Sequence, residues 1–200
     1  MPVVADLGSF RDPGGRIYLL EDCVYRTVTP AAVEDFEHVE RSGLIEALVE
    51  RGQVLPATKV DGAILGNKAD GAHYVVQHPK LPFVSYPYEW PFAALKAAAL
   101  LHLDIHLEAL RRGVTLSDAS AFNIQFIGAR PVFIDRLSFV RYRPGEIWVG
   151  HRQFCEQFLN PLLLRALFGV SHNAWYRGAQ EGIAADDLRR LLRWRHKLSW

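Results

Sequence analysis

A proline-rich segment, residues 79–91, divides this 200-residue chain into two parts of different character. Its four prolines exclude a regular helix, because proline has no backbone N–H for helical hydrogen bonding. Before the segment, short apolar and β-branched stretches alternate with turn residues. After it, residues 92–112 have the composition of a long helix that ends at Gly113. We therefore predict an extended connector between two lobes, residues 1–85 and 86–200.

The first part has the pattern of a β-sheet interrupted by a pair of helices. Strands are expected at residues 3–10, 16–20, 23–28, 54–60 and 74–78. A first helix, residues 29–41, is predicted to begin with Thr29 as its N-cap and Pro30 in its first turn. A second short helix is predicted over residues 44–51.

The second part is predicted to be mainly helical around one β-hairpin. After the long helix, two short strands are expected at residues 124–127 and 132–134, joined by a tight turn. Helices are expected over residues 148–168 and 186–196. This order of elements favours an α+β fold with segregated lobes over alternating βαβ units.

The composition argues against several functional classes. A formal net charge of +1, with 22% charged residues, gives no general attraction to nucleic acid or anionic membranes. No apolar run approaches the roughly 20 residues needed to span a bilayer, and the start lacks the pattern of a secretory signal. Cys23 and Cys155 form no CxxC motif, so neither a disulfide framework nor a structural zinc site is expected. We expect a cytoplasmic protein with no membrane span.

The segment most informative about chemistry is residues 113–139. Asp118 follows the long helix, Asn123 directly precedes the first hairpin strand, and Asp135 ends the second. The hairpin is expected to bring Asn123 and Asp135 together, with Asp118 in the loop that leads in. Carboxylate and amide oxygens are ligands that a hard divalent cation prefers, and a carboxylate without metal can orient or deprotonate a hydroxyl. The alternative is a polar loop in which Asn123 and Asp135 are ordinary turn residues.

In this segment the chain resembles the protein-kinase-like superfamily, especially the aminoglycoside and choline phosphotransferases and related small-molecule kinases. Their catalytic loop, Asp-x4-Asn, is followed about a dozen residues later by a metal-binding Asp that ends a strand. The resemblance implies that Asp118 is the catalytic residue and that Asn123 and Asp135 hold Mg²⁺. Two departures stand out: Leu116 replaces the usual His, and residues 134–139 lack the glycine of the Asp-Phe-Gly motif.

The resemblance also assigns roles in the first part of the chain. The turn that contains Gly14 and Gly15 corresponds to the glycine-rich loop of a kinase, whose backbone N–H groups approach phosphate. Arg26 stands in place of the kinase lysine as a phosphate contact, with Glu37 or Glu40 as its partner. An ordinary hairpin turn and an exposed strand residue are the alternatives for these positions.

The connector corresponds to the kinase hinge. Residues 86–91, including Glu89, would contact the nucleotide there. The alternative is that its aromatic residues pack between the lobes.

The resemblance as a whole implies a two-lobe kinase-like fold, with a small β-rich first lobe and a mainly helical second lobe. The implied function is ATP- and Mg²⁺-dependent transfer of phosphate to a small hydroxylated molecule. The alternative is a catalytically inactive, pseudokinase-like module that binds a ligand or positions another domain. A fainter resemblance, to the amino-terminal region of bacterial proteins that carry a methyltransferase domain further along, suggests the kind of domain it would accompany.

Two other patterns have simpler explanations. His102 and His106 lie four residues apart on the long helix, a spacing suited to zinc, but Leu103 stands where the zinc-protease pattern has Glu. Hydrogen-bonded, partly buried histidines are therefore expected. The basic, aromatic residues 189–200 are predicted as a terminal helix with a solvated face; the alternative is contact with an acidic partner, nucleic acid or a membrane surface. We also expect a larger parent protein or a partner domain at this end.

Overall fold

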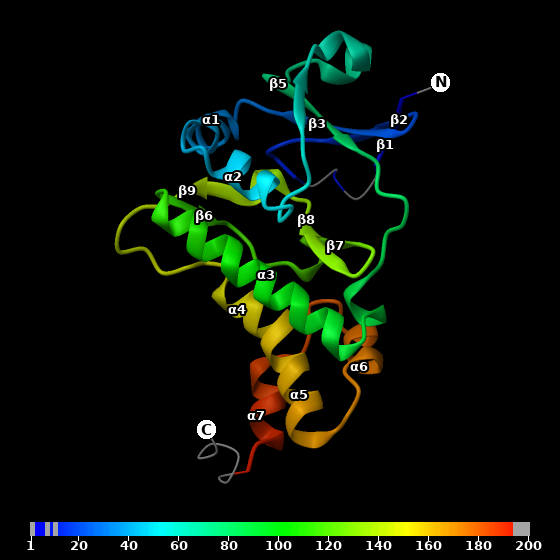
Figure 1. Ribbon diagram of the computed structural model, residues 1–200, viewed down its shortest axis with the longest axis vertical. Helices are drawn as coiled ribbons and strands as arrows, with labels where there is room; N and C mark the ends of the chain where they lie inside the picture. Colours follow the sequence, from blue (N-terminus) through cyan, green and yellow to red (C-terminus); the bar gives the residue numbers. More distant parts are fainter. Residues whose placement is uncertain (1–2, 7–8, 10–11, 194–200) are drawn as a thin grey trace. The chain divides into compact units, whose positions relative to one another are not determined.

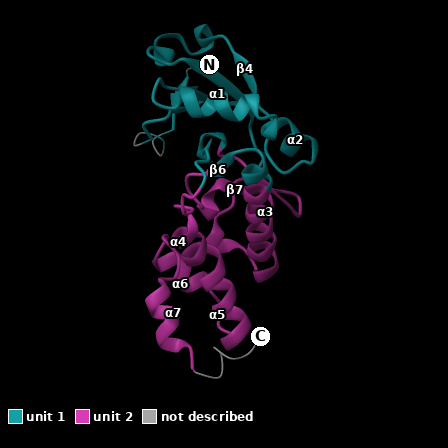
Figure 2. Cartoon of the chain, turned by 90° about the vertical axis from the view of Figure 1, so that its left-hand side faces the viewer, with its two compact units in different colours: residues 1–82, 108–115, 136–144 teal, residues 83–107, 116–135, 145–200 magenta. Residues whose placement is uncertain are grey.

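The computed structural model describes residues 3–6, 9 and 12–193, and its architecture is mixed α+β (Figure 1). The chain forms two compact units, each built from three segments (Figure 2). The first unit comprises residues 1–82, 108–115 and 136–144, and the second comprises residues 83–107, 116–135 and 145–200. The first passage between the units lies at residues 82 and 83, inside the proline-rich segment.

The first unit is built on a five-stranded antiparallel sheet with the strand order β1-β2-β3-β5-β4. The strands are β1 (Val4–Ala5), β2 (Ile17–Leu20), β3 (Cys23–Val28), β4 (Thr58–Val60) and β5 (Tyr74–Pro79). The longest pairing joins β3 to β5 and places Arg26 opposite Val76. β4 is shorter than predicted, because Pro56 has no N–H for a continuous ladder.

Two helices follow β3, α1 (Val33–Arg41) and α2 (Leu44–Glu50), and they contact each other. Phe36 on α1 forms an apolar cluster with Val28 and Val76 of the sheet. The predicted N-cap, Thr29, is wrong: its hydroxyl donates to the Pro13 carbonyl oxygen at 2.7 Å, and α1 begins after Ala32 without a side-chain cap. A 3-10 helix, Gly62–Ala69, follows β4.

The second unit contains most of α3 (Phe92–Arg111) and the hairpin of β7 (Ile124–Ile127) and β8 (Arg130–Phe133). Both were predicted, and Gly113 follows α3 with a φ of 69°, a left-handed conformation that glycine adopts without steric cost. The predicted helix over residues 148–168 is a run of α4 (His151–Phe154), a π-helix (Cys155–Leu159) and α5 (Asn160–Phe168).

The remaining elements differ more from the prediction. β6 (Val114–Leu116) pairs with β9 (Phe139–Arg141) in a two-stranded sheet, and α6 (Asn173–Gly178) is an additional helix. α7 (Ala185–Leu191) is shorter than the predicted helix. Most of the basic terminal stretch, residues 194–200, lies outside the described residues.

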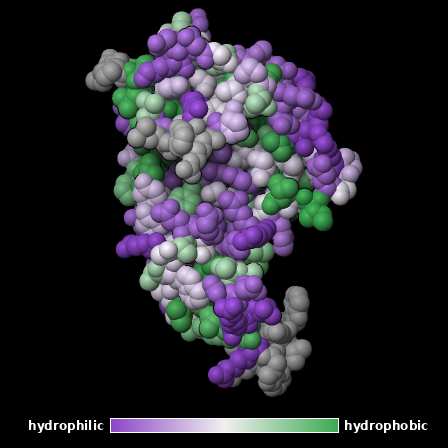
Figure 3. Space-filling view, turned by 180° about the vertical axis from the view of Figure 1, so that it is seen from behind, coloured by the Kyte–Doolittle hydropathy of each residue, from purple (hydrophilic) through white to green (hydrophobic). Residues whose placement is uncertain are grey.

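The core of the second unit is rich in aromatic side chains. Phe133, Phe158 and Tyr176 are fully buried. Burying a side chain of this kind contributes roughly 1.5–3 kcal/mol, so these three residues are a main source of stability. By contrast, hydrophobic and hydrophilic residues are intermixed over the face shown in Figure 3. Within residues 3–6, 9 and 12–193, none of the helices combines the length and apolarity needed to cross a bilayer.

Candidate functional site

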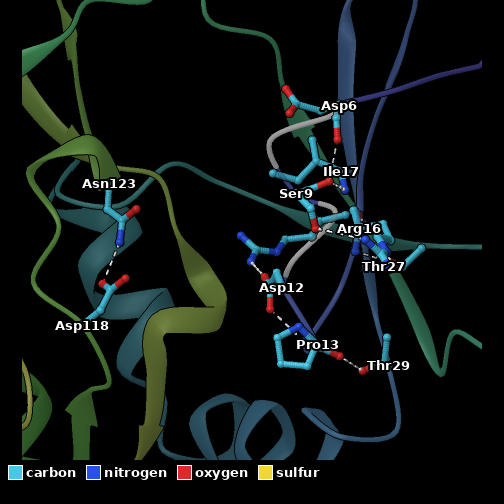
Figure 4. Close-up of polar contacts among 12 residues, drawn as sticks. Asp6, Ser9, Asp12, Pro13, Arg16, Ile17, Thr27, Thr29, Asp118 and Asn123 are labelled. Carbon is cyan, nitrogen blue, oxygen red and sulfur yellow. Dashed lines mark hydrogen bonds and ion pairs between the residues drawn. The ribbon is translucent and has the colours of Figure 1, made fainter. Parts of the chain in front are cut away.

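Asp118 and Asn123 face each other within one loop of the second unit, which we call the Asp118 loop (residues 116–123). Asn123 Nδ2 donates a hydrogen bond of 2.8 Å to Asp118 Oδ1 (Figure 4). A carboxamide that donates from its nitrogen presents its carbonyl oxygen on the other side, and Figure 4 shows Asn123 Oδ1 turned away from Asp118. That oxygen is a suitable ligand for a hard cation.

Local sequence explains why the loop turns at this point. Ser120 is extended, and its hydroxyl accepts a hydrogen bond of 3.3 Å from the Phe122 N–H. This cap starts a single 3-10 turn, Ala121–Asn123, which ends where β7 begins. Serine favours such caps because its short side chain reaches a backbone N–H two residues on.

Asp135 lies at the hairpin end beside Asn123. The hairpin register pairs Ile124 with Phe133, and the Ile134 N–H donates to the Asn123 carbonyl oxygen at 2.8 Å. Asp135 is therefore the residue that follows the backbone partner of Asn123. The predicted hairpin is confirmed, and its register joins the two strand ends that carry Asn123 and Asp135.

The connector is fixed to the second unit by side chains that the sequence analysis did not single out. Gln125, a buried residue of β7, accepts from the Ser85 N–H at 2.9 Å and donates to the Ser85 carbonyl oxygen at 3.0 Å. Asn173 Nδ2 donates to the carbonyl oxygens of Tyr88 and Trp90 at 2.8 and 3.0 Å. In the sequence, the signal for this contact is a glutamine in the otherwise apolar strand β7.

Glu89, the predicted nucleotide contact in the connector, has a local structural partner. Its Oε2 accepts a hydrogen bond of 2.9 Å from the Tyr86 N–H and caps the 3-10 helix Pro87–Glu89. Tyr86 in turn stacks on Tyr88, with ring centroids 5.4 Å apart and an interplanar angle of 6°.

In the first unit, Asp12 organises the turn that the sequence analysis assigned to phosphate. Its carboxylate accepts from the Gly14 N–H at 2.8 Å and pairs with the Arg26 guanidinium. A Cβ atom at Gly15 would lie 1.9 Å from the Thr27 carbonyl oxygen, so glycine is required there by the close approach to β3. Gly15 thus has a structural explanation within the turn, part of which is drawn in Figure 4.

The two glutamates proposed as partners of Arg26 bind other side chains of the first unit. The Tyr74 hydroxyl donates to Glu37 Oε1 at 2.7 Å and holds the pKa of Glu37 below its ordinary value. Glu40 pairs with Lys59 at 3.1 Å and with the Arg136 guanidinium. Lys59 and Arg136 were missed because each meets Glu40 across a long stretch of sequence.

His102 is buried among aromatic rings. Phe133, Trp148, Phe154 and Phe158 surround it, with ring centroids 5.6–5.9 Å away. Neither ring nitrogen has a hydrogen-bond partner among the described residues, so the expected hydrogen bonding is wrong for this histidine. Burial lowers the pKa of His102 to about 3.

The described part of the chain holds no metal site made only of His, Cys, Asp and Glu. Among residues 3–6, 9 and 12–193, no three such side chains are placed to hold an ion together. The predicted set of Asp118, Asn123 and Asp135 includes an amide, so it would be a different kind of site. Ligands that are oxygens only would suit Mg²⁺.

These observations define an α+β chain with a carboxylate–amide loop, and comparisons with known proteins add the following. No protein-family model matches the chain. It is 46% identical over 192 residues to the nodulation protein NoeA of Rhizobium meliloti (strain 1021), a match that covers 96% of this chain. The chain spans only 40% of that relative's length. A solved structure of vaccinia related kinase 3 matches 94% of this chain and 68% of that chain, with a TM-score of 0.46 and 11% identity.

Proposed function

We propose that this chain has a kinase-like fold and is an ATP- and Mg²⁺-dependent phosphotransferase acting on a small hydroxylated molecule. The observation that carries the proposal is the 2.8 Å hydrogen bond from Asn123 to Asp118. It orients a carboxylate and an amide oxygen in one loop, next to the strand end that carries Asp135. The sequence spacing of these three residues supports the same assignment.

Each of the three residues has a distinct proposed role. Asp118 orients the acceptor hydroxyl and takes its proton. Asn123 Oδ1 and the Asp135 carboxylate hold Mg²⁺, which when bound neutralises charge on the phosphate oxygens. Such sites work mainly by positioning and charge neutralisation, so the loss of one ligand is expected to be severe.

Arg26, Gly14 and Gly15 remain predicted phosphate contacts of the first unit, and Glu89 remains a predicted nucleotide contact. Arg26 already binds the carboxylate of Asp12, and a guanidinium binds phosphate with the same forked geometry. The proposal would be strengthened if nucleotide competed with Asp12 for Arg26.

A catalytically inactive binding module is the second candidate. Two observations favour it: the Gly14 N–H and the Arg26 guanidinium are both engaged by Asp12, and the 46%-identical relative extends well beyond the matched region. In this case the chain would bind a ligand or position another domain, such as a methyltransferase, of a longer protein. The relative's name suggests a role connected with nodulation but specifies no reaction.

Thermal unfolding with ATP or GTP, with and without Mg²⁺, tests the nucleotide binding that the enzyme proposal requires. At about 100 times the dissociation constant, a ligand stabilises the folded state by about 2.7 kcal/mol, which raises Tm by roughly 5–10 °C. Asp135→Asn should remove the Mg²⁺ dependence of this rise. Asp104→Asn, the same change at an exposed position of α3, should preserve it. Absence of a shift with either nucleotide would refute the enzyme proposal.

Transfer of labelled γ-phosphate to a panel of hydroxylated compounds separates the two candidates. We expect Asp118→Asn to lower kcat by about 10²–10⁴-fold, because proton transfer from the acceptor is lost. Nucleotide binding by this variant should stay near the unmodified level. Binding without turnover on any acceptor would favour the inactive module.

A further inference from the structure

The geometry points to Gln153 and Gln157 as positioning residues, which hold the backbone of the Asp118 loop and so set the Asp118–Asn123 contact. Gln153 Oε1 accepts from the Ala119 N–H at 2.8 Å, and Gln157 Oε1 accepts from the Ala121 N–H at 2.7 Å. The importance of this positioning for catalysis rests on the function proposed above. The hydrogen bonds themselves do not.

A third contact fixes the beginning of the loop. Trp148 Nε1 donates to the Leu116 carbonyl oxygen at 2.9 Å. Side chains from residues 148–157 therefore bind the loop backbone at three points: the carbonyl of Leu116 and the N–H groups of Ala119 and Ala121. All of these residues belong to the second unit.

The spacing of the two glutamines matches that of the two amides. The N–H groups of Ala119 and Ala121 both reach acceptors four residues apart on one helical run, so they point to the same side of the loop. Two extended residues advance about 6.6 Å, and four helical residues advance about 6 Å. The π-helix Cys155–Leu159 starts between the glutamines, and its wider turn keeps residues four apart close to one face.

Burial makes both acceptors necessary. Ala119 and Ala121 are fully buried, and Gln157 is 3% exposed. A buried N–H left without an acceptor is strongly disfavoured, so either the glutamine bond is kept or the loop must move. A glutamine satisfies the amide without introducing a buried charge.

The two bonds have a consequence for Asp118. Aspartate in a loop commonly accepts from backbone N–H groups of its own turn, as Asp12 does with Gly14. In the Asp118 loop, distant glutamines accept from the N–H groups that flank Ser120. The backbone that carries Asp118 is thereby held in the conformation in which its carboxylate accepts from the Asn123 amide, which is the arrangement that the proposed chemistry needs.

The test compares Gln153→Met and Gln157→Met, which remove the acceptor at similar volume, with Gln153→Glu, which keeps it. Arg152→Met is the matched control, because Arg152 is exposed and pairs with Glu156 rather than with the loop. Gln153 is half-buried, so its variants are expected to fold even if those of Gln157 do not.

The first readout is nuclear magnetic resonance of the whole chain. We expect hydrogen exchange at Ala119 to rise about 10- to 100-fold in Gln153→Met. The Asn123 side-chain NH₂ signals should shift in Gln153→Met and return in Gln153→Glu, whereas Arg152→Met should change neither. If the Asn123 signals stay unchanged in the methionine variants, the positioning role is overturned, whether or not the chain is an enzyme.

The second readout is phosphotransfer, if the unmodified chain has it. Gln153→Met should lower kcat by about 10- to 100-fold with little change in the KM for ATP, and Gln153→Glu should restore most of it. An unchanged kcat beside faster exchange would overturn the catalytic importance of the two bonds. Absence of activity in the unmodified chain would refute the proposed function alone, because the Asn123 signals still decide the positioning claim.

Discussion

The Asp118 loop of the second unit and the Asp12 turn of the first unit (residues 12–15) differ in which side chains accept hydrogen bonds from their backbone N–H groups. In the turn, the Asp12 carboxylate accepts from the Gly14 N–H and also pairs with Arg26. In the loop, Gln153 and Gln157 come from elsewhere in the chain to accept from backbone N–H groups. The Asp12 carboxylate thus completes its own turn, whereas the backbone around Asp118 is held by side chains from another segment, and the Asp118 carboxylate accepts from the Asn123 amide.

Gly15→Ala is expected to have the largest effect on stability. It tests whether glycine is needed in the Asp12 turn for packing against β3. The new methyl group would lie 1.9 Å from the Thr27 carbonyl oxygen, so the backbone must shift. We expect a loss of about 3–5 kcal/mol in the free energy of unfolding, measured in urea. Gly14→Ala, with Asp12 Oδ1 at 3.1 Å as its nearest contact, should lose much less. Full stability of Gly15→Ala with lost nucleotide binding would instead support a phosphate loop.

Acidification is expected to weaken the second unit through His102. In the unfolded chain this imidazole titrates near pH 6.5, and in the folded chain at about 3. Between those values the unfolded state binds the additional proton, so the free energy of unfolding falls as pH falls, by at most about 1.4 kcal/mol per pH unit. Denaturant unfolding at pH 7.5, 6 and 5 should show the slope, and His102→Leu should flatten it. An equal slope in His102→Leu would assign the dependence to other groups.

Gln125→Met should remove the two hydrogen bonds between the hairpin and the connector and leave the conformation of the Asp118 loop unchanged. Both backbone groups of Ser85 would lose their side-chain partner. We expect a loss of about 1–3 kcal/mol in unfolding free energy and faster hydrogen exchange at Ser85. The Asn123 side-chain signals should stay constant, and their movement would show that connector and loop are coupled.

Asp12→Asn is expected to have the smallest effect on stability. It separates the two contacts of the Asp12 carboxylate, with the Gly14 N–H and with Arg26. The amide oxygen of Asn still accepts from the Gly14 N–H, but the charge that pairs with Arg26 is lost. A partly exposed pair of this kind contributes about 1 kcal/mol or less, which urea unfolding at low salt resolves. If Arg26 contacts phosphate, this variant should bind ATP more tightly, and unchanged binding would argue against that role.

The elements with strong local signals were predictable from the sequence. The long apolar run before Gly113 gave α3, and the strand pattern around Gly128 gave the hairpin that aligns Asn123 with Ile134. The sequence spacing also selected Asp118 and Asn123, whose side chains do meet. These features depend on residues close together in the chain.

The missed features depend on residues far apart in the chain. The pairing of β6 with β9 and the hydrogen bond from the Ala121 N–H to Gln157 join distant segments, so no local sequence pattern predicts them. Thr29 is not the cap because α1 begins only at Val33, so Thr29 lies three residues before the N-cap position, Ala32. The prediction of a hydrogen-bonded His102 is wrong because aromatic rings surround its imidazole.

The interleaved segments of the first unit limit how the chain can be divided. A fragment that stops in the connector would lack Arg112, whose guanidinium donates to the carbonyl oxygens of Ser42 and Gly43 at 3.2 and 3.0 Å. It would also lack the Gly113 carbonyl that bonds His38 at 3.0 Å, and the guanidinium of Arg136 that pairs with Glu40. Truncation in the connector therefore removes the hydrogen bonds and the ion pair that hold α1 and the residues between α1 and α2. Splitting the gene there should yield two pieces that become soluble only when they are co-expressed.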